Sequence, residues 1–432
     1  MFLRSLVGLS LCIAAGAQDD SVTRLRARLP QLKKNLEQNI VPFWYPKTLD
    51  RANGGYIINH DAAGNPTGEG HKMIVTQARQ VWLFARLARS GYRRKEMLDA
   101  AELGYRFLKD KMWDKTHGGF YWEVDATGNK VDKPHKHLYG QSFALYAIAE
   151  YALAGKRADV LAFAKELFHL LEAKSHDARY GGYVEFFSRD WSAPPAAEQP
   201  YMGGGATGLK LMNTHLHLLE SMTTFYRASQ LPLARERLLE LIHIESNSVV
   251  RKGLGSLMAA CTDKYERDWT PRLDGNNARV SYGHDLENIW LLSDAMQAAG
   301  ISPYPFVDLF QNLFSYSKKF GYDEANGGFF DSGAFSQLAD RREKVWWTQA
   351  EALVSALTMF QLTGKPEYVA VFEKTLDFVD QRQTDWKTGE WHPSVTAAGV
   401  AQGAKAQRWK AGYHNGRAMI ECIERIGPMQ VQ

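Results

Sequence analysis

The residues best suited to chemistry begin with a histidine and a glutamate at the head of a predicted helix. His284 and Glu287 stand three residues apart in Y-G-H-D-L-E, and apolar residues from Leu286 to Met296 follow at helical spacing. Side chains three apart share one face of a helix, so the carboxylate can lie beside the imidazole and favour its protonated form. This pair predicts a general acid or base, although a core histidine satisfied by a neighbouring carboxylate has the same spacing.

Five further predicted helices, starting near Met73, Leu138, Leu211, Val345 and Gly412, also carry polar and aromatic groups in their first turns. These groups are Gln77, Arg79, Tyr139, Gln141, Asn213, His215, His217, Trp346, Trp347, Gln349, Glu351, Tyr413, His414, Asn415 and Arg417. Six helices that bring polar groups to the same end predict one central pocket.

The elements that must position these groups are about twelve helices, read from periodicity and from the prolines and glycines between them. We expect them at residues 24–43, 72–90, 95–112, 138–154, 158–173, 208–228, 233–248, 283–299, 304–319, 345–363, 366–382 and 412–425. The polar clusters fall on alternate helices, and the partner helices look amphipathic. This alternation favours an all-α, closed (α/α)6 barrel over an open solenoid, formed by one domain over residues 18–432.

A glycine pair followed by an aromatic residue recurs between the helices. It appears at Gly54-Gly55-Tyr56, Gly118-Gly119-Phe120, Gly181-Gly182-Tyr183 and Gly327-Gly328-Phe329, and more weakly at Gly389-Glu390-Trp391. The copies are 61 to 64 residues apart except for one gap of 146, near whose middle lies Gly253-Leu254-Gly255. The repeat therefore predicts six units, each with a tight, hairpin-like turn at positive φ.

Composition excludes some classes of protein. The 432 residues carry 52 basic and 48 acidic side chains without a basic stripe, so we expect no nucleic-acid partner. The 12 Trp, 19 Tyr and 21 Phe suit either stacking on sugars or core packing. No run after residue 17 reaches the roughly 18 to 20 apolar residues that span a bilayer. Beyond the leader only Cys261 and Cys422 remain, which is not a disulfide framework.

The first 17 residues have the form of a secretory signal. Met1 to Ala17 contains one arginine, a short apolar run and small residues at Ala15 and Ala17. We expect cleavage before Gln18 and export of the mature protein.

Four motifs resemble the N-acylglucosamine 2-epimerase superfamily, and specifically its cellobiose 2-epimerase branch. They are M-N-T-H-L-H-L-L-E at 212–220, Y-G-H-D-L-E at 282–287, W-W-T-Q-A-E-A at 346–352 and W-K-A-G-Y-H-N-G-R at 409–417. The resemblance spans about residues 25–427. It implies an (α/α)6 barrel that inverts C2 of the reducing-end sugar of a β-1,4-linked disaccharide, such as cellobiose or mannobiose, without a cofactor.

The resemblance also implies roles for particular residues. His284 and His414 match the catalytic histidines, Glu287 the carboxylate that assists the first, and Arg79 the arginine near the C1 and C2 oxygens. Substrate contacts are expected from Tyr139, Asn213, His217, Trp346, Trp347 and Glu351. Gln407-Arg408 and Ala411-Gly412 depart from the family pattern, which bears on the preferred disaccharide.

The chemistry of C2 inversion suits these residue types. The proton on C2 is removable only after the sugar ring opens, when the C1 aldehyde can hold the charge as an enediolate. A base near C2, a cation at the oxyanion and an acid on the other face are then needed, which histidine and arginine can supply.

Four other readings remain open. His215 and His217, two apart on a helix, point in different directions, so we expect no metal site there. Glu287 and Glu351 could serve a glycoside hydrolase, and the tryptophans a sugar-binding protein without catalysis. Within the family, an N-acylglucosamine 2-epimerase or an aldose-ketose isomerase is the alternative.

Overall fold

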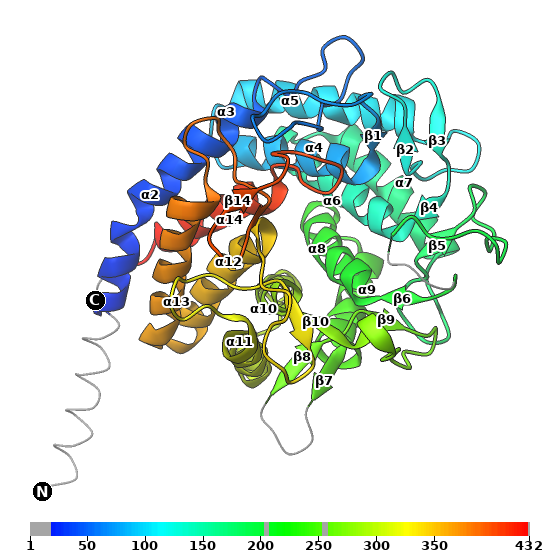
Figure 1. The fold of residues 1–432 in the computed structure, drawn as a ribbon. Coiled ribbons are helices and arrows are strands. Elements are labelled where there is room, and N and C mark those ends of the chain that lie inside the picture. Colours follow the sequence, from blue (N-terminus) through cyan, green and yellow to red (C-terminus); the bar gives the residue numbers. More distant parts are fainter. Residues whose placement is uncertain (1–18, 203–206, 253–257, 431–432) are drawn as a thin grey trace, which may run out of the picture.

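The computed structural model describes residues 19–202, 207–252 and 258–430. Within them, six helices form an inner ring (Figure 1). These are α4 (Ile74–Arg89), α6 (Leu138–Gly155), α8 (Met212–Ser229), α10 (Tyr282–Ala298), α12 (Trp346–Thr363) and α14 (Tyr413–Ile426). Each contacts the next, and α14 contacts α4, so the ring closes. The prediction of a closed (α/α)6 barrel is confirmed.

An outer layer of helices surrounds this ring. It comprises residues 19–27, α2 (Leu29–Lys34), η1 (Asn35–Ile40), α3 (Val41–Trp44), α5 (Arg94–Phe107), η2 (Leu108–Met112), α7 (Ala158–Lys174), α9 (Pro232–His243), η3 (Ile244–Ser248), η5 (Tyr304–Phe306), α11 (Val307–Gly321), α13 (Pro366–Phe378) and η6 (Val379–Gln383). Outer helices bury one stripe, such as Met97, Ala101 and Tyr105 of α5, whereas the inner helix α4 buries all residues from Ile74 to Ala88.

Short antiparallel strands join the helices at one end of the barrel. They are β1 (Lys72–Met73), β2 (Glu123–Val124), β3 (Val131–Lys133), β4 (Lys136–His137), β5 (Phe186–Phe187), β6 (Lys210–Leu211), β7 (Val250–Lys252), β8 (Ala259–Cys261), β9 (Lys264–Tyr265), β10 (Arg279–Ser281), β11 (Ser332–Ala334), β12 (Lys344–Val345), β13 (Ser394–Val395) and β14 (Ala401–Gln402); η4 (Gly275–Ala278) precedes β10. The helix expected from residue 208 starts at Met212 instead, because Lys210 and Leu211 pair with β9.

The glycine-pair turns adopt the predicted conformation. Both glycines of the second copy have positive φ, 69° at Gly118 and 72° at Gly119, and Trp113 bridges Phe120 across the turn. The other four copies make the same bridge, including the weak one, where Glu390 takes positive φ. Gly253-Leu254-Gly255, the predicted sixth copy, lies outside the described residues; β7 and β8, on either side of it, pair in antiparallel fashion.

A buried ion pair accompanies five of these turns. The pairs join Asp50 to Lys72 (2.7 Å), Asp114 to Lys136 (3.1 Å), Asp177 to Lys210 (3.1 Å), Asp323 to Lys344 (2.8 Å) and Asp385 to Lys405 (2.8 Å). Four of the lysines stand two residues before an inner helix. In the sixth unit Val280 takes that position and packs in a separate apolar cluster with Tyr282 and Tyr316. Four of the pairs therefore attach a turn to the head of an inner helix.

Three expectations concern other parts of the chain. Cys261 and Cys422 are both free and buried. None of the helices among the described residues combines the length and apolarity needed to cross a bilayer. The proposed signal, residues 1–17, lies outside the described residues.

Candidate active site

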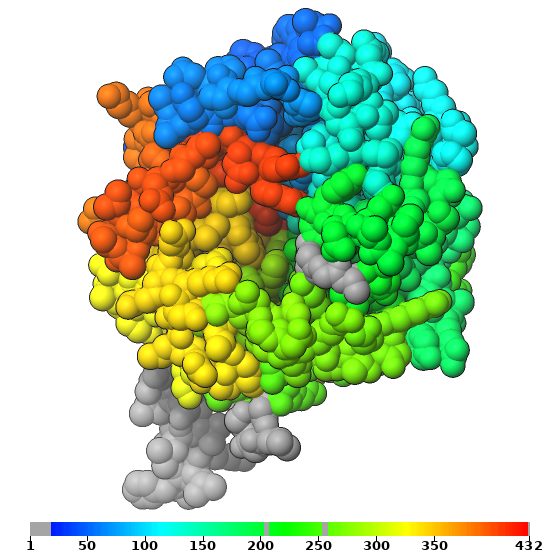
Figure 2. Space-filling model, turned by 45° about the vertical axis from the view of Figure 1, so that its right-hand side comes forward, coloured from blue at the N-terminus to red at the C-terminus, as the bar shows by residue number. Residues whose placement is uncertain are grey.

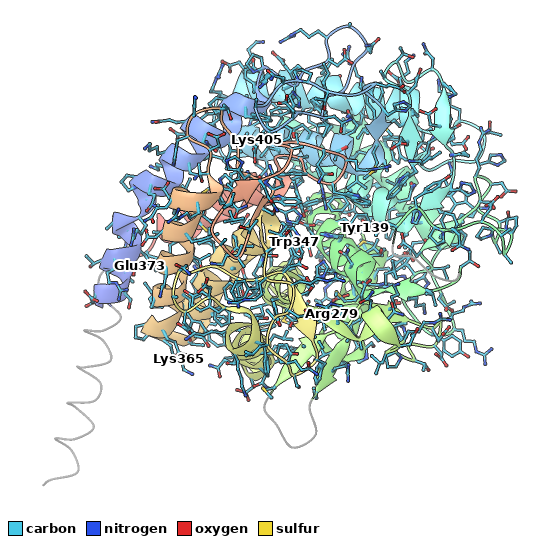
Figure 3. The ribbon with its side chains drawn as sticks, viewed as in Figure 1. Tyr139, Arg279, Trp347, Lys365, Glu373 and Lys405 are labelled. Atoms are coloured by element: carbon cyan, nitrogen blue, oxygen red, sulfur yellow. The ribbon has the colours of Figure 1, made fainter. Side chains whose placement is uncertain are left out.

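A cavity of about 150 Å³ opens where the inner helices begin. It is lined by Arg79, Tyr139, Asn213, His217, His284, Glu287, Trp346, Trp347, Trp409 and His414. Figure 2 shows the hollow on this face, and Figure 3 shows Tyr139 and Trp347 near the middle of the ring. Nine of the ten predicted site residues line the cavity, and Glu351 does not. A larger hollow of about 390 Å³ between α11 and α13 lies on the outer ring, away from these groups.

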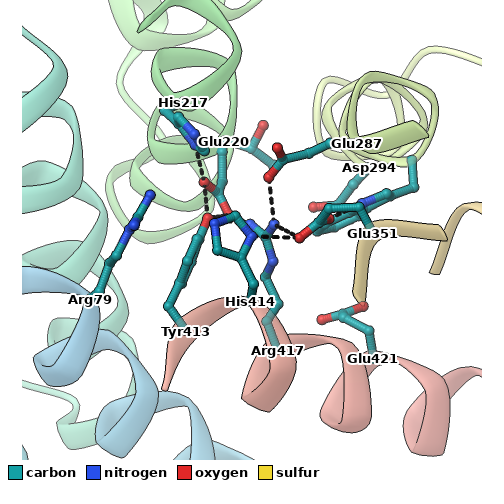
Figure 4. A network of polar contacts seen from close by, with 12 residues as sticks. Arg79, His217, Glu220, Glu287, Asp294, Glu351, Tyr413, His414, Arg417 and Glu421 are labelled. Carbon is teal, nitrogen blue, oxygen red and sulfur yellow. Dashed lines mark hydrogen bonds and ion pairs between the residues drawn. The ribbon is translucent and has the colours of Figure 1, made fainter. Parts of the chain in front are cut away.

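The His414 imidazole forms a hydrogen bond with the carboxyl group of Glu351. The imidazole Nδ1 lies 2.7 Å from Glu351 Oε1, and that carboxylate also accepts hydrogen bonds from Arg417 Nη2 (2.8 Å) and Trp290 Nε1 (2.8 Å) (Figure 4). Burial, and then the charge of Glu287, raises the pKa of Glu351 well above its usual range. Burial, and then Arg79, lowers the pKa of His414. Glu351 thus contacts a histidine rather than the cavity.

His284 lies against Trp347, with ring centroids 4.8 Å apart. It is accessible only in part, yet it sits deep in the protein, and burial lowers its pKa to about 4. Gly283 makes this packing possible, because a Cβ there would lie 2.4 Å from a Trp347 ring atom. The Trp347 ring centroid also lies 5.7 Å from that of His414, with the planes tilted by 43°, so its indole lies beside both histidines.

The prediction that His284 and Glu287 contact each other is wrong. Among the described residues no hydrogen bond joins them, and Glu287 Oε1 instead accepts one from Arg417 Nη2 at 2.6 Å. The spacing of three allowed the contact, but a guanidinium from α14 gives the carboxylate a charge-assisted partner. Burial raises the pKa of Glu287 to about 8. The prediction of a protonated His284 is also wrong, because burial lowers its pKa and no hydrogen bond to a carboxylate among the described residues offsets that effect.

Arg79 is a buried cation without an acidic partner in the described residues. Its Nη1 donates to the Trp409 carbonyl (3.0 Å) and its Nη2 to Tyr139 Oη (3.0 Å). The guanidinium carbon lies 4.3 Å from the Phe143 ring centroid and 4.9 Å from that of Tyr413. Aromatic faces hold the cation in place, and no carboxylate among the described residues forms an ion pair with it. Arg79 is therefore suited to bind an anion that forms in the cavity.

Beneath the cavity lies a charge cluster that sequence reasoning did not assign. Arg417 is 1% exposed and donates to Glu220, Glu287 and Glu351. Glu220 also accepts from Tyr413 Oη and lies 3.1 Å from His217 Nδ1. Burial, ahead of neighbouring cations, lowers the pKa of His217.

The spacing of polar residues along the inner helices could have indicated these groups from the sequence. On five inner helices a polar residue stands two positions before a residue at or beneath the cavity: Gln77 before Arg79, His215 before His217, Asp285 before Glu287, Gln349 before Glu351 and Asn415 before Arg417. The first of each pair serves the turns, as when Gln77 and Gln349 accept from Tyr56 and Phe329. His215 likewise accepts from the Tyr183 N–H (2.9 Å) and is buried, as expected for a structural histidine.

One group of side chains has the spacing of a metal site. Ligand atoms of Glu287, Glu351 and His414 lie within 4.8 Å of one another. Arg417 donates to both carboxylates, so a cation of the protein itself already stands between them. These residues therefore do not fit a metal ion well, and the absence of a metal cofactor stays a prediction.

Comparison with known proteins identifies the family. The chain matches the N-acylglucosamine 2-epimerase (GlcNAc 2-epimerase) family over residues 55–418. It is 28% identical over 413 residues to a cellobiose 2-epimerase of Dictyoglomus turgidum, covering 93% of this chain and all of that one. Solved cellobiose 2-epimerases from Bacillus thermoamylovorans (29% identity, TM-score 0.83, 93% of this chain and 100% of that one) and Spirochaeta thermophila (32%, 0.81, 93% and 97%) share the fold. The chain therefore belongs to the N-acylglucosamine 2-epimerase family, and within it is similar to the cellobiose 2-epimerases.

Proposed function

We propose that this enzyme inverts C2 of the reducing-end sugar of a β-1,4-linked disaccharide of the cellobiose or mannobiose type, without a cofactor. The observation that carries the proposal is the pairing, in one small cavity, of two histidines with an arginine that has no acidic partner among the described residues. The similarity to proteins named cellobiose 2-epimerase supports the choice of substrate class.

In the proposed reaction His284, as a neutral imidazole, removes the C2 proton of the ring-opened aldose. The C–H electron pair forms a C1–C2 double bond, and the carbonyl electrons move onto the C1 oxygen. Arg79 stabilises this enediolate, because its guanidinium is already oriented and lacks a competing carboxylate. His414 then returns a proton to C2 from the other face, and the negative charge collapses back to the aldehyde.

The proton that His414 donates needs a place to reside beforehand. The hydrogen-bonded pair of His414 and Glu351 supplies one, since burial raises the pKa of the carboxyl well above its usual range. The proton can lie on either partner, and the developing enediolate charge draws it toward the imidazole. In the reverse direction the two histidines exchange roles.

The test is turnover in D2O, with a chelator present, followed by NMR of the product. We expect deuterium at C2 of the epimer, because each histidine exchanges its proton with solvent. His284→Ala and His414→Ala should each lower kcat by about 10²- to 10⁴-fold. His169→Ala, which changes an exposed histidine on α7, is the matched control and should change nothing. Unlabelled C2, or near-normal turnover without either cavity histidine, would overturn the proposal.

The same experiment separates the alternatives. A hydrolase would raise the number of reducing ends, and an isomerase would yield a ketose. Glu287 and Glu351 accept hydrogen bonds from one nitrogen of Arg417, so they stand together on one side rather than flanking a glycosidic bond. An aldose-ketose isomerase needs only one base, whereas both histidines that the proposed mechanism uses, His284 and His414, line this cavity. Both observations favour epimerisation.

A further inference from the structure

One of the glycine-pair turns departs from the others at its second position. Four turns have glycine there, with φ between 69° and 78°, at Gly55, Gly119, Gly182 and Gly328. The turn before Trp391 has Glu390 instead, and its φ of 66° lies in the left-handed region that residues with a side chain rarely adopt. Non-glycine residues held in that region cluster at functional sites, where surrounding contacts stabilise the conformation. Glu390 is therefore a candidate for a functional role.

A shorter residue on the inner helix leaves space for the Glu390 side chain. At Gly55 a Cβ would lie 2.6 Å from Oε1 of Gln77, which accepts the N–H of the next residue. The inner helix α14 carries Asn415 in place of that glutamine, and its side chain is one methylene shorter. Glu390 Oε1 itself accepts the N–H of Trp391, at 2.9 Å. The carboxylate thus replaces the side-chain acceptor of the other turns and adds a negative charge.

That charge is buried and paired. Glu390 and Lys410 are both 0% exposed, and Lys410 Nζ lies 2.6 Å from Glu390 Oε1. The same oxygen accepts from Asn415 Nδ2 (2.6 Å), and Oε2 accepts from Trp44 Nε1. Lys410 Nζ also donates to the Lys405 carbonyl (2.8 Å). Because a buried ion pair is costly to break when further hydrogen bonds hold both partners, the pair fixes the residues that form it.

The ion pair is joined through the backbone to residues of the cavity. Lys410 follows Trp409, whose side chain lines the cavity and whose carbonyl accepts from Arg79 Nη1 at 3.0 Å. Asn415 follows His414, which also lines the cavity. The buried carboxylate thus holds the chain on both sides of His414 and beside the carbonyl that orients Arg79.

We propose that Glu390 is a positioning residue for the reaction. Its ion pair with Lys410 fixes the chain segment 409–415, and that segment places the His414 imidazole and the carbonyl that holds Arg79. Glu390 does not line the cavity, so it acts through these residues and not on the substrate. The inference rests on the proposed function, because that function gives His414 and Arg79 their roles. It adds a residue remote from the substrate on which kcat depends.

Glu390→Gly separates positioning from turn formation. Glycine adopts the positive φ more readily than glutamate and restores the sequence of the other turns, so a residue needed only for the turn could be replaced without loss. We expect kcat to fall instead by about 10- to 100-fold, because small displacements of catalytic groups have effects of this size, with KM within about threefold of the wild type. Glu390→Gln keeps an oxygen for Lys410 and Asn415 and should retain more of kcat than Glu390→Gly.

A second variant separates positioning from stability. Glu390→Gly leaves the buried Lys410 cation unpaired, whereas the double variant Glu390→Gly with Lys410→Met removes both charges and should recover stability to urea. Its kcat should nevertheless stay low, because segment 409–415 is no longer fixed. Lys344→Met, which breaks the buried pair with Asp323 at another turn, is the matched control. It should lower stability and leave kcat within about twofold of the wild type.

A folded double variant with near-normal kcat would overturn the inference. An equal fall in kcat for Lys344→Met and Glu390→Gly would also overturn it, because the loss would then follow stability. Crystal structures of the wild type and the double variant repeat the test without turnover. Arg79 should lose its contact with the Trp409 carbonyl, and an unchanged contact would refute the positioning role. A wild type that forms a ketose, or no epimer, would refute the proposed function alone.

Discussion

His284 and His414 line the cavity as neutral imidazoles, because burial lowers the pKa of both side chains. The two carboxyls that meet at Arg417 shift in the opposite direction: burial raises the pKa of Glu287 to about 8, and burial and then the charge of Glu287 raise the pKa of Glu351 well above its usual range. The site thus keeps both imidazoles neutral near neutral pH, and burial favours the protonated form of the two carboxyls. Such perturbed groups around one cavity are typical of acid-base catalysis.

The pH dependence of catalysis follows from these shifts. The base form of His284 is lost when the pH falls through its pKa, which is about 4 rather than the usual 6.5 or so. We expect kcat/KM to stay on its plateau through pH 6 and to fall only near pH 4 to 5. The measurement is kcat/KM between pH 3.5 and 9, with circular dichroism at each pH as a control for unfolding. An acid limb at pH 6.5 or above in folded enzyme would contradict the expectation.

At the scale of elements, the Asp-Lys ion pairs hold the turns against the inner helices that carry the site. The heads of α4, α6, α8 and α12 are each attached to a turn by an Asp-Lys pair, and at α10 apolar packing around Val280 takes that place. Two of the turns are also contacted by a repeated R-D-W segment. Arg189 pairs with Asp114 (2.8 Å) and Arg267 with Asp177 (2.7 Å), while the following tryptophans cover Gly119 and Gly182. These contacts fix the ends of the helices that carry the site.

Breaking one of these pairs should destabilise the barrel. Lys344 is 4% exposed and Asp323 15% exposed, so Lys344→Met leaves a largely buried carboxylate without its cation. We expect the free energy of unfolding to fall by about 3 kcal/mol, the lower end for such a loss, because Asp323 keeps hydrogen bonds from Ala325 and Asn326.

Urea denaturation measures that loss, and Lys365→Met, at an exposed lysine, is the matched control. Asp323 has its pKa lowered to about 2 by hydrogen bonds and the charge of Lys344, which outweigh its burial. Its contribution to stability should therefore persist above about pH 4 and disappear as the pH falls toward 2. A change below 1 kcal/mol at pH 7 would mean that the turn is held by other contacts.

At the scale of the molecule, closure of α14 onto α4 brings groups more than 300 residues apart in the chain into one site, such as Arg79 and the Trp409 carbonyl. We propose that residues 18–432 form a single domain and that residues 1–17 direct its export. A ring of this kind is complete only when its last helix has docked, so loss of α14 removes both the closure and His414.

The export proposal has its own test. When the full chain is expressed in a bacterium, we expect it in the periplasmic fraction or the medium, with Gln18 as the first residue by intact mass. Leu9→Arg interrupts the apolar run and should retain the protein, uncleaved, in the cytoplasm. Wild-type protein that stays inside the cell with residues 1–17 attached would refute the signal.

The sequence by itself determined the twelve helices, their alternation and the glycine-pair turns, because these depend on neighbours within a few residues. It also identified the cavity residues, through motifs that stand at the heads of alternate helices. Only the tertiary structure decided how the charges pair. Glu287 was expected beside His284 and contacts Arg417, whereas Glu351 was expected at the substrate and holds His414. Spacing along a helix limits which side chains can meet, but the partner chosen is set by groups that ring closure brings from other helices.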